Sequence, residues 1–189
     1  MSKGILLGHR ISQHGIEIDV DKVQVIVALE PPKHVSELRG FLEHVGYYRR
    51  FIKDYAVLVD ALTLLLKKTI DYIWEVAQQQ AFKVLEKKLV EAPVLRALDW
   101  EKPFQVYVDT FAFAIEVMLS QKDEEKKDHP IYYASRQLTN SEKDYSTTER
   151  EALGMIFSVR KFCHYLLGCE FVFHVDHYAL KHLVQKADL

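Results

Sequence analysis

Two segments of the chain repeat one pattern and decide the fold: Phe104-Gln-Val-Tyr-Val-Asp109 and Phe171-Val-Phe-His-Val-Asp176. Each is a short apolar run that ends in a carboxylate, and this pattern predicts a β-strand in both places. Every second side chain of a strand lies on the same face. If the two strands pair, Asp109 and Asp176 therefore lie side by side at their carboxyl ends.

A helix is predicted between these two strands. Ser146-Thr-Thr-Glu149 has the form of a capping box, and apolar residues recur after it at helical spacing until Gly168. A strand, a helix and a second parallel strand form a right-handed crossover. The carboxyl edge of such a sheet is where open α/β folds usually hold their sites. Glu151 lies in the first turns of this helix, so we expect it to lean over the same edge.

The rest of the second half supplies further strands. They are predicted over 115–121 and 131–135, with a charge-rich loop at 122–128 between them. Leu180 and Leu183 begin a last predicted helix. The predicted order is β-β-β-α-β-α, which makes a mixed sheet with one crossover helix.

The first half has a mostly helical period. A β-hairpin is predicted over residues 4–18. Four helical segments follow it, at 19–29, 36–52, 57–66 and 74–90. Asp19 or Asp21 is the expected cap of the first, and Ser36 is the expected cap of the second. We therefore predict a chain of α+β or α/β class, in which a hairpin and a helical unit precede a mixed sheet.

Composition restricts the possible functions. Hydrophobic residues make up 49% of the 189 residues, which is enough for a packed core. The formal net charge is −2, whereas a stand-alone nucleic-acid binder often has a basic excess that neutralises phosphates. Cys163 and Cys169 are expected to be reduced thiols in an intracellular protein, and the alternative is one disulfide between them. No apolar run approaches the roughly 20 residues of a membrane span, so no membrane partner is expected.

The three carboxylates at the predicted edge, Asp109, Glu151 and Asp176, favour a metal site. Carboxylates that converge without a Lys or Arg repel one another unless a cation joins them. Ligation by oxygen alone favours Mg²⁺ or Mn²⁺. The alternative interpretation is structural, because an Asp after a strand is commonly a turn former or a helix cap. A zinc site at His174 and His177 is a weaker hypothesis, because no Cys or His cluster supports it.

Motifs along nearly the whole chain resemble the pol polyprotein of gypsy-like LTR retrotransposons. In chain order they are Leu7-Gly-His-Arg-Ile-Ser12, Leu38-Arg-Gly-Phe-Leu42, Tyr47-Tyr-Arg-Arg-Phe-Ile52, Ala92-Pro-Val-Leu95, Tyr132-Tyr-Ala-Ser-Arg136, Tyr145-Ser-Thr-Thr-Glu-Arg-Glu151 and Val175-Asp-His177. The resemblance implies three parts. Residues 1–18 would end a reverse-transcriptase palm with a primer-grip-like hairpin, 19–98 would form a helical thumb, and 99–189 would be an RNase H-like domain.

The resemblance implies a metal-dependent ribonuclease H that cuts the RNA strand of an RNA–DNA hybrid. Asp109, Glu151 and Asp176 match its catalytic and metal-binding carboxylates, with two Mg²⁺ or Mn²⁺ ions as cofactors. The implied partners are the hybrid or a template–primer duplex and the remainder of the polyprotein. The implied location is the cytoplasm, inside a virus-like particle, or the nucleus.

The thumb motif carries Arg49, Arg50 and Lys53, which the resemblance suggests as phosphate contacts. The alternative is an amphipathic helix with a solvated basic face, and the sequence does not decide between the two interpretations.

The chain also departs from the family pattern. The polymerase Asp-Asp motif is absent, and the fourth catalytic Asp is expected beyond Leu189. Thr110-Phe111 replaces the usual Ala-Ser, and Glu43 and Glu116 stand where the family typically has Gly. We therefore expect an incomplete two-metal site with weak or absent nuclease activity. The alternative is a non-catalytic nucleic-acid-binding module or an interaction module retained by a host.

Overall fold

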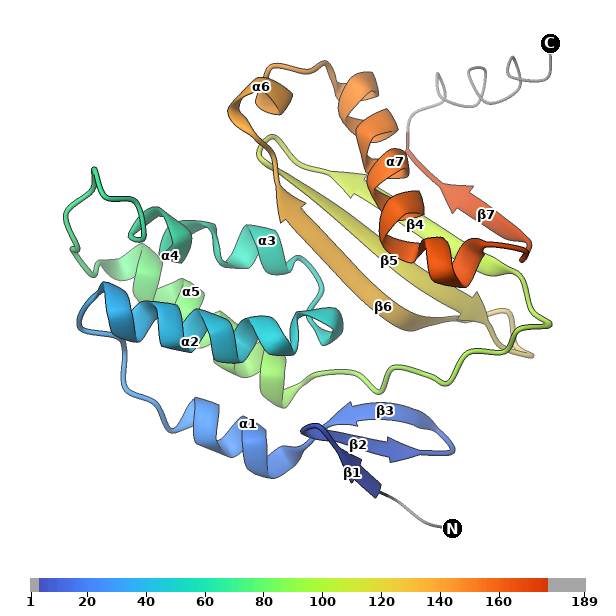
Figure 1. Ribbon diagram of the computed structural model, residues 1–189, viewed down its shortest axis with the longest axis horizontal. Helices are drawn as coiled ribbons and strands as arrows, with labels where there is room; N and C mark the ends of the chain where they lie inside the picture. Colours follow the sequence, from blue (N-terminus) through green and yellow to red (C-terminus); the bar gives the residue numbers. More distant parts are fainter. Residues whose placement is uncertain (1–3, 177–189) are drawn as a thin grey trace. The chain divides into compact units, whose positions relative to one another are not determined.

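The computed structural model describes residues 4–176 of the chain. The chain divides into two compact units, Met1–Ala97 and Leu98–Leu189, which are described separately. Figure 1 shows helices and a small sheet in the first unit and a larger sheet with its helices in the second. The prediction of a mixed α and β chain is confirmed.

The first unit opens with a three-stranded antiparallel sheet in the order β1-β2-β3. Its strands are β1 (Gly4–Leu6), β2 (His9–Ser12) and β3 (Gly15–Ile18). The predicted hairpin had two strands. The first of them is divided because Leu7 and Gly8 both have positive φ, 49° and 71°. Two such residues in succession form the tight turn that joins antiparallel strands.

The helices of this unit are α1 (Val20–Val27), α2 (Val35–Tyr47), the 3-10 turn η1 (Arg49–Phe51), α3 (Tyr55–Leu58), α4 (Asp60–Leu64) and α5 (Val76–Val90). Two details of the prediction are wrong. The cap of α2 is His34, whose ring accepts the Glu37 N–H, rather than Ser36. The helix expected over 57–66 is two short helices, because Val59 has a ψ of −3° instead of a helical value.

The core of the first unit lies between these helices. Phe41 of α2 and Phe82 of α5 are buried, with ring centroids 4.6 Å apart. Leu38, Val45, Leu62 and Leu85 are fully buried as well. The helical spacing of these residues in the sequence is therefore explained by one shared apolar core.

The second unit contains a four-stranded sheet in the order β6-β5-β4-β7. Its elements are β4 (Phe104–Thr110), β5 (Ala114–Lys122), β6 (Asp128–Gln137), α6 (Asn140–Lys143), α7 (Thr147–Leu166) and β7 (Phe171–His174). Strands β4, β5 and β6 are antiparallel neighbours, and β7 is parallel to β4. The predicted chain order of three strands, a helix and a fourth strand is confirmed, as is the parallel pairing of β4 with β7, and α6 was missed. The predicted helix at Leu180 and Leu183 lies outside the described residues.

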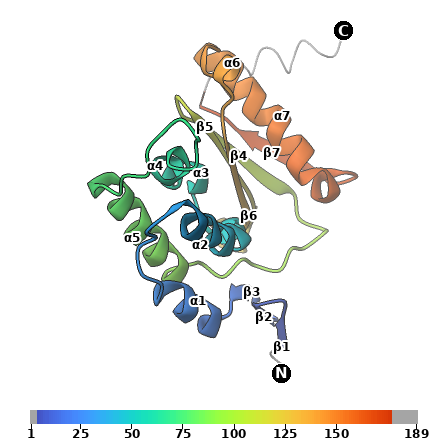
Figure 2. The same ribbon diagram turned by 60° about the vertical axis from the view of Figure 1, so that its left-hand side comes forward.

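Helix α7 covers one face of this sheet, as Figures 1 and 2 both show. Its contact is close at Gly154, where an added Cβ would lie 2.5 Å from a methyl carbon of Val108. Phe162 of the same helix is fully buried against Tyr132 of β6. Because Val108 faces the helix, its neighbours Tyr107 and Asp109 belong to the opposite face of β4.

Candidate functional site

Two of the three predicted carboxylates are positioned by the parallel pairing of β4 with β7. The register runs from Phe104 opposite Phe171 to Tyr107 opposite His174. Continuing it by two residues along each strand brings Asp109 level with Asp176. Both side chains are exposed, and Asp176 lies in a bend just after β7 rather than inside the strand as predicted.

Glu151 reaches the same end of the sheet on α7. This helix runs antiparallel to β4, because Tyr165 near its end lies 6.5 Å from the Phe104 ring while Gly154 near its start meets Val108. Glu151 is one turn before Gly154, so it lies toward the carboxyl end of β4. It is only 6% exposed.

The carboxylates share one end of the sheet, but they do not form a tight cluster. Among residues 4–176, no three His, Cys, Asp or Glu side chains are grouped so that they could hold a metal ion. Their carboxylate chemistry suits Mg²⁺ or Mn²⁺, which prefer oxygen ligands. The assignment of Asp109, Glu151 and Asp176 as metal ligands therefore stays a prediction.

Glu116 adds a further carboxylate at this end. It pairs directly with Asp109 in the register of β4 and β5, and it is only 4% exposed. The sequence analysis noted Glu116 only as a departure from the Gly that is typical of the family. Directly opposed like charges are unfavourable unless other groups compensate them, so the surroundings of Asp109 differ from those that a Gly at this position would give.

A side-chain network beside the carboxylates was not predicted. His174 Nε2 lies 2.8 Å from Gln105 Oε1, and the His174 ring stacks on Tyr107 at 4.2 Å with the planes 10° apart. The Tyr107 hydroxyl donates to Asp128 Oδ2 at 2.7 Å. Burial, together with this hydrogen bond, raises the pKa of Tyr107 to about 12. The hydroxyl therefore stays protonated at neutral pH and keeps donating.

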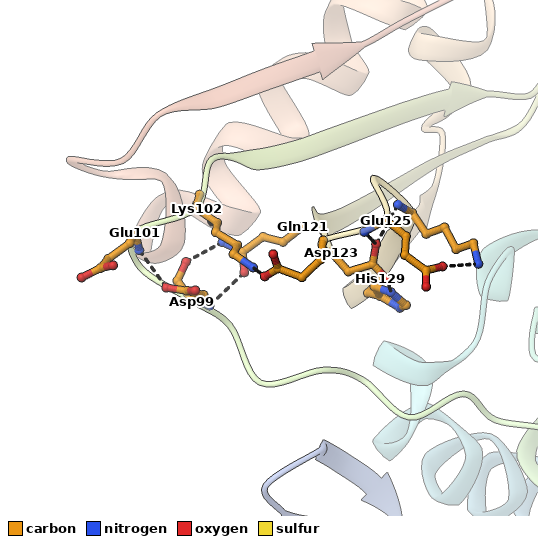
Figure 3. A network of polar contacts seen from close by, with 9 residues as sticks. Asp99, Glu101, Lys102, Gln121, Asp123, Glu125 and His129 are labelled. Atoms are coloured by element: carbon orange, nitrogen blue, oxygen red, sulfur yellow. Dashed lines mark hydrogen bonds and ion pairs between the residues drawn. The ribbon is translucent and has the colours of Figure 1, made fainter.

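The loop between β5 and β6 carries a second polar network, shown in Figure 3. Asp123 accepts hydrogen bonds from the His129 ring at 2.5 Å and from the backbone N–H groups of Glu125 and Lys127 at 2.9 Å. The His129 hydrogen bond, followed by these backbone donors, lowers the pKa of Asp123 to about 2. Gln121 donates to the Asp99 and Lys102 carbonyls, which attaches the segment before β4 to the same hairpin. These contacts make the predicted charge-rich loop an ordered turn.

The three predicted nucleic-acid contacts in the first unit differ in exposure. Arg49 and Lys53 are exposed, whereas Arg50 is half-buried with its guanidinium 5.9 Å from the Phe51 ring centroid. Arg50 therefore combines its charge with a packing contact. All three remain predicted phosphate contacts.

Comparison with known proteins identifies the family. The family model of the RNase H-like domain found in reverse transcriptase matches residues 74–173. The chain belongs to this family. The retrovirus-related Pol polyprotein from transposon 297 of Drosophila melanogaster is 35% identical over 184 residues, covering 94% of this chain and 16% of that protein. The Tf2-3 transposon polyprotein of Schizosaccharomyces pombe is 33% identical over 160 residues, which cover 85% of this chain and 12% of that protein.

Solved reverse transcriptases share the fold of this RNase H-like chain. The foamy viral protease–reverse transcriptase in complex with double-stranded DNA matches 98% of this chain and 39% of its own, with a TM-score of 0.83 and 20% identity. The same viral protein in complex with an RNA/DNA hybrid matches with a TM-score of 0.78, 19% identity and coverage of 97% and 25%. The chain thus spans a small part of the polyproteins it resembles, and the resemblance to a retrotransposon pol polyprotein is confirmed.

Two other findings concern the described residues. No helix between residues 4 and 176 has the length and apolarity that a membrane span requires. Cys163 and Cys169 are both free thiols, the first exposed and the second half-buried.

Proposed function

We propose that this chain supplies the thumb and RNase H-like part of a retrotransposon Pol polyprotein, and that its second unit acts on the RNA strand of an RNA–DNA hybrid. The observation that carries this proposal is the parallel register of β4 and β7, crossed by α7, which brings Asp109, Glu151 and Asp176 to one end of one sheet. The family membership agrees with it.

Asp109, Glu151 and Asp176 would hold the divalent cations that RNase H-like enzymes generally use. When bound, such cations lower the pKa of a coordinated water and stabilise the leaving oxygen. The exposed carboxylates of Asp109 and Asp176 are accessible to a phosphodiester, whereas the buried Glu151 would approach from the helix side. Selection of RNA would come from contacts with 2′-hydroxyls across the wide minor groove of the hybrid.

We expect cleavage by residues 1–189 alone to be weak, because the family resemblance implies a fourth metal-binding Asp in addition to Asp109, Glu151 and Asp176. The exposed basic groups of the first unit favour a second candidate function, in which the chain binds hybrid or template–primer duplex without cutting it. Arg49, the first residue of η1, and Lys53, two residues after its end, are exposed and are the basic groups that would serve such binding.

The test is cleavage of a hybrid with a labelled RNA strand by the full chain, in Mg²⁺, in Mn²⁺ and in EDTA. We expect slow metal-dependent cleavage that Asp109→Asn abolishes. Asp144→Asn is the matched control, since Asp144 is an exposed carboxylate at the end of α6, and it should cleave like the wild type. Hybrid binding without cleavage would favour the second function, and neither binding nor cleavage would refute both.

A further inference from the structure

His174 lies at the end of β7, close in sequence to the predicted site residue Asp176. It is the last residue of β7 that pairs with β4, and Asp176 follows two residues later. The pairing with β4 is short, comprising four residue pairs from Phe171 to His174. Whatever fixes His174 therefore also limits where the chain can place Asp176.

The first two residues of β7 provide little of this fixation. Phe171 and Val172 are 39% and 49% exposed, so they bury only part of their apolar surface. In the part of the chain that the structure describes, β7 is one of the two edge strands of the sheet and has β4 as its strand neighbour. Edge strands with few buried contacts open most readily. Near Asp176, Phe173 and Val175 pack partly buried against the hydrophobic core, and the side chain of His174 between them adds contacts with β4 on the other face.

The side chain of His174 makes two such contacts with β4. Its Nε2 lies 2.8 Å from Oε1 of Gln105, which is only 6% exposed. Its ring stacks face to face on Tyr107, with centroids 4.2 Å apart. Gln105 and Tyr107 lie on the same face of β4 as Asp109, so the contacts connect the two strands that carry the two exposed carboxylates.

Tyr107 is itself held by residues of β5 and β6, which lie on the side of β4 away from β7. Its hydroxyl donates to Asp128 Oδ2 at 2.7 Å, and Asp128 Oδ1 accepts from the fully buried Ser120 hydroxyl at 3.2 Å. The ring on which His174 stacks therefore cannot turn freely. His174, Tyr107, Asp128 and Ser120 form a cross-strand network that runs from β7 through β4 to β5 and β6.

We propose that His174 is a positioning residue for the carboxylate pair. Its hydrogen bond and ring stack fix the end of β7 and so hold Asp176 level with Asp109. The effect of this role on catalysis rests on the proposed function. The fixation of β7 rests only on the contacts that His174 makes with β4. It differs from a zinc-ligand role, because Nε2 is engaged with Gln105.

The variants separate the two contacts of His174. His174→Ala removes both of them, whereas His174→Phe keeps a stacking ring and removes the hydrogen bond. Val172→Ala is the matched control, because Val172 lies on the same face of β7 and lacks the ring contact that His174 makes. All are made in the full chain, and far-ultraviolet circular dichroism verifies that each variant folds.

Three measurements follow. Amide hydrogen exchange measures the opening of β7, and Mn²⁺ titration measures the affinity of the carboxylates for the metal ion. Hybrid cleavage gives kcat and KM separately. We expect His174→Ala to expose the β7 amides and to weaken Mn²⁺ binding about tenfold, the usual loss when a group that orients a metal ligand is removed. Its kcat should fall with KM unchanged. His174→Phe should restore most of the protection and of the Mn²⁺ affinity, and Val172→Ala should change neither.

Unchanged β7 exchange and Mn²⁺ affinity in His174→Ala would overturn the inference, as would an equal loss in Val172→Ala. If His174→Ala does not fold, His174→Phe tests the inference instead. Wild-type-like amide protection of β7 and wild-type-like Mn²⁺ affinity in His174→Phe would support the ring stack, and a full loss of both would refute it. A wild-type chain that binds neither Mn²⁺ nor hybrid would refute the proposed function. In that case the exchange data alone still test whether His174 fixes β7.

Discussion

At Gly15 the backbone has a φ of +133°, and a Cβ added there would lie 2.0 Å from the carbonyl oxygen of Leu95. Next to it, Ile16 and Leu95 exchange two backbone hydrogen bonds of 2.8 and 2.9 Å. Since both the dihedral angle and the contact exclude a side chain, we predict that Gly15→Ala lowers the free energy of unfolding by about 2–3 kcal/mol. Urea denaturation of the full chain measures this.

Gly40 provides the control for that substitution. It lies within α2, and an added Cβ would meet nothing within 4 Å. Gly40→Ala should therefore stabilise the chain by about 0.5–1 kcal/mol, because Ala has the higher helix propensity. If both substitutions changed stability in the same direction, the interpretation of Gly15 would be wrong.

Individual site residues were predictable to different degrees. The alternation of side chains on β4 and β7 suffices to locate Asp109 and Asp176, and the capping box locates Glu151. The roles of His174 and Tyr107 depend on which residues of two strands, 67 positions apart, lie opposite each other. No local pattern contains that register, so the sequence suggested for His174 only a weak metal-ligand role.

At the scale of single elements, the start of α7 determines the place of Glu151. The Ser146 hydroxyl accepts the Glu149 N–H at 3.3 Å, and Glu149 Oε2 accepts the Ser146 N–H at 2.8 Å. We predict that Ser146→Ala destabilises the second unit by about 1 kcal/mol, the usual cost of losing such a cap. It should also weaken Mn²⁺ binding and reduce metal-dependent cleavage, because the first turns of the helix fray where Glu151 is held.

Thr139→Ala tests whether the loss is specific to α7. Thr139 forms an equivalent capping box with Glu142 on the short helix α6. Its replacement should cost similar stability by thermal or urea unfolding and leave Mn²⁺ affinity unchanged. Equal effects of both variants on Mn²⁺ affinity would show that α7 capping does not position Glu151.

The hairpin of β5 and β6 should respond to acid through Asp123. Its pKa is lowered from 3.8 to about 2 in the folded chain, chiefly by the His129 hydrogen bond. A carboxyl with a lowered folded pKa stabilises the fold above its unfolded pKa and loses this contribution as pH falls through the folded pKa. We predict that the wild type loses stability relative to Asp123→Asn between about pH 4 and pH 2. Urea midpoints of both proteins across this range measure the difference, and a pH-independent difference would contradict the prediction.

Element types were largely predictable, and their ends were not. The capping box of α7 and the strand alternation are local signals, and both elements appear where they were expected. The division of the first hairpin strand at Leu7 and Gly8 depends on a turn with two positive φ angles, one of them at a leucine. A leucine rarely adopts that conformation, so the sequence pattern favoured one longer strand.

At the scale of the whole molecule, the chain order of strands and helices was predictable from local periodicity. The parallel pairing of β4 with β7 was expected from the helix that precedes β7, whereas the places of β5 and β6 in the sheet came from the structure. The grouping of the carboxylates was not predictable, because it depends on side-chain rotamers and on the bend after β7. The sequence therefore predicts the shared edge of the sheet, whereas the spacing of the three side chains had to come from the structure.

Charge is also a property of the whole molecule, and here it is nearly balanced at −2. Binding to a polyanion must then come from local basic groups, of which Arg49 and Lys53 are exposed. We predict that Arg49→Ala combined with Lys53→Ala weakens hybrid binding. The slope of log K against log salt concentration should become shallower by about 1–2, since each lost phosphate contact changes it by about 0.9.

The matched control is Lys67→Ala combined with Lys68→Ala, which removes the same two positive charges from exposed positions after α4. Fluorescence anisotropy of a labelled hybrid at several salt concentrations compares the two double variants with the wild type. If only net charge mattered, both would lose affinity equally and their slopes would change alike. A loss confined to the Arg49 and Lys53 variant means that phosphates contact the turn η1 itself, because long-range attraction between exposed charges is largely screened beyond about 10 Å at 0.1 M salt.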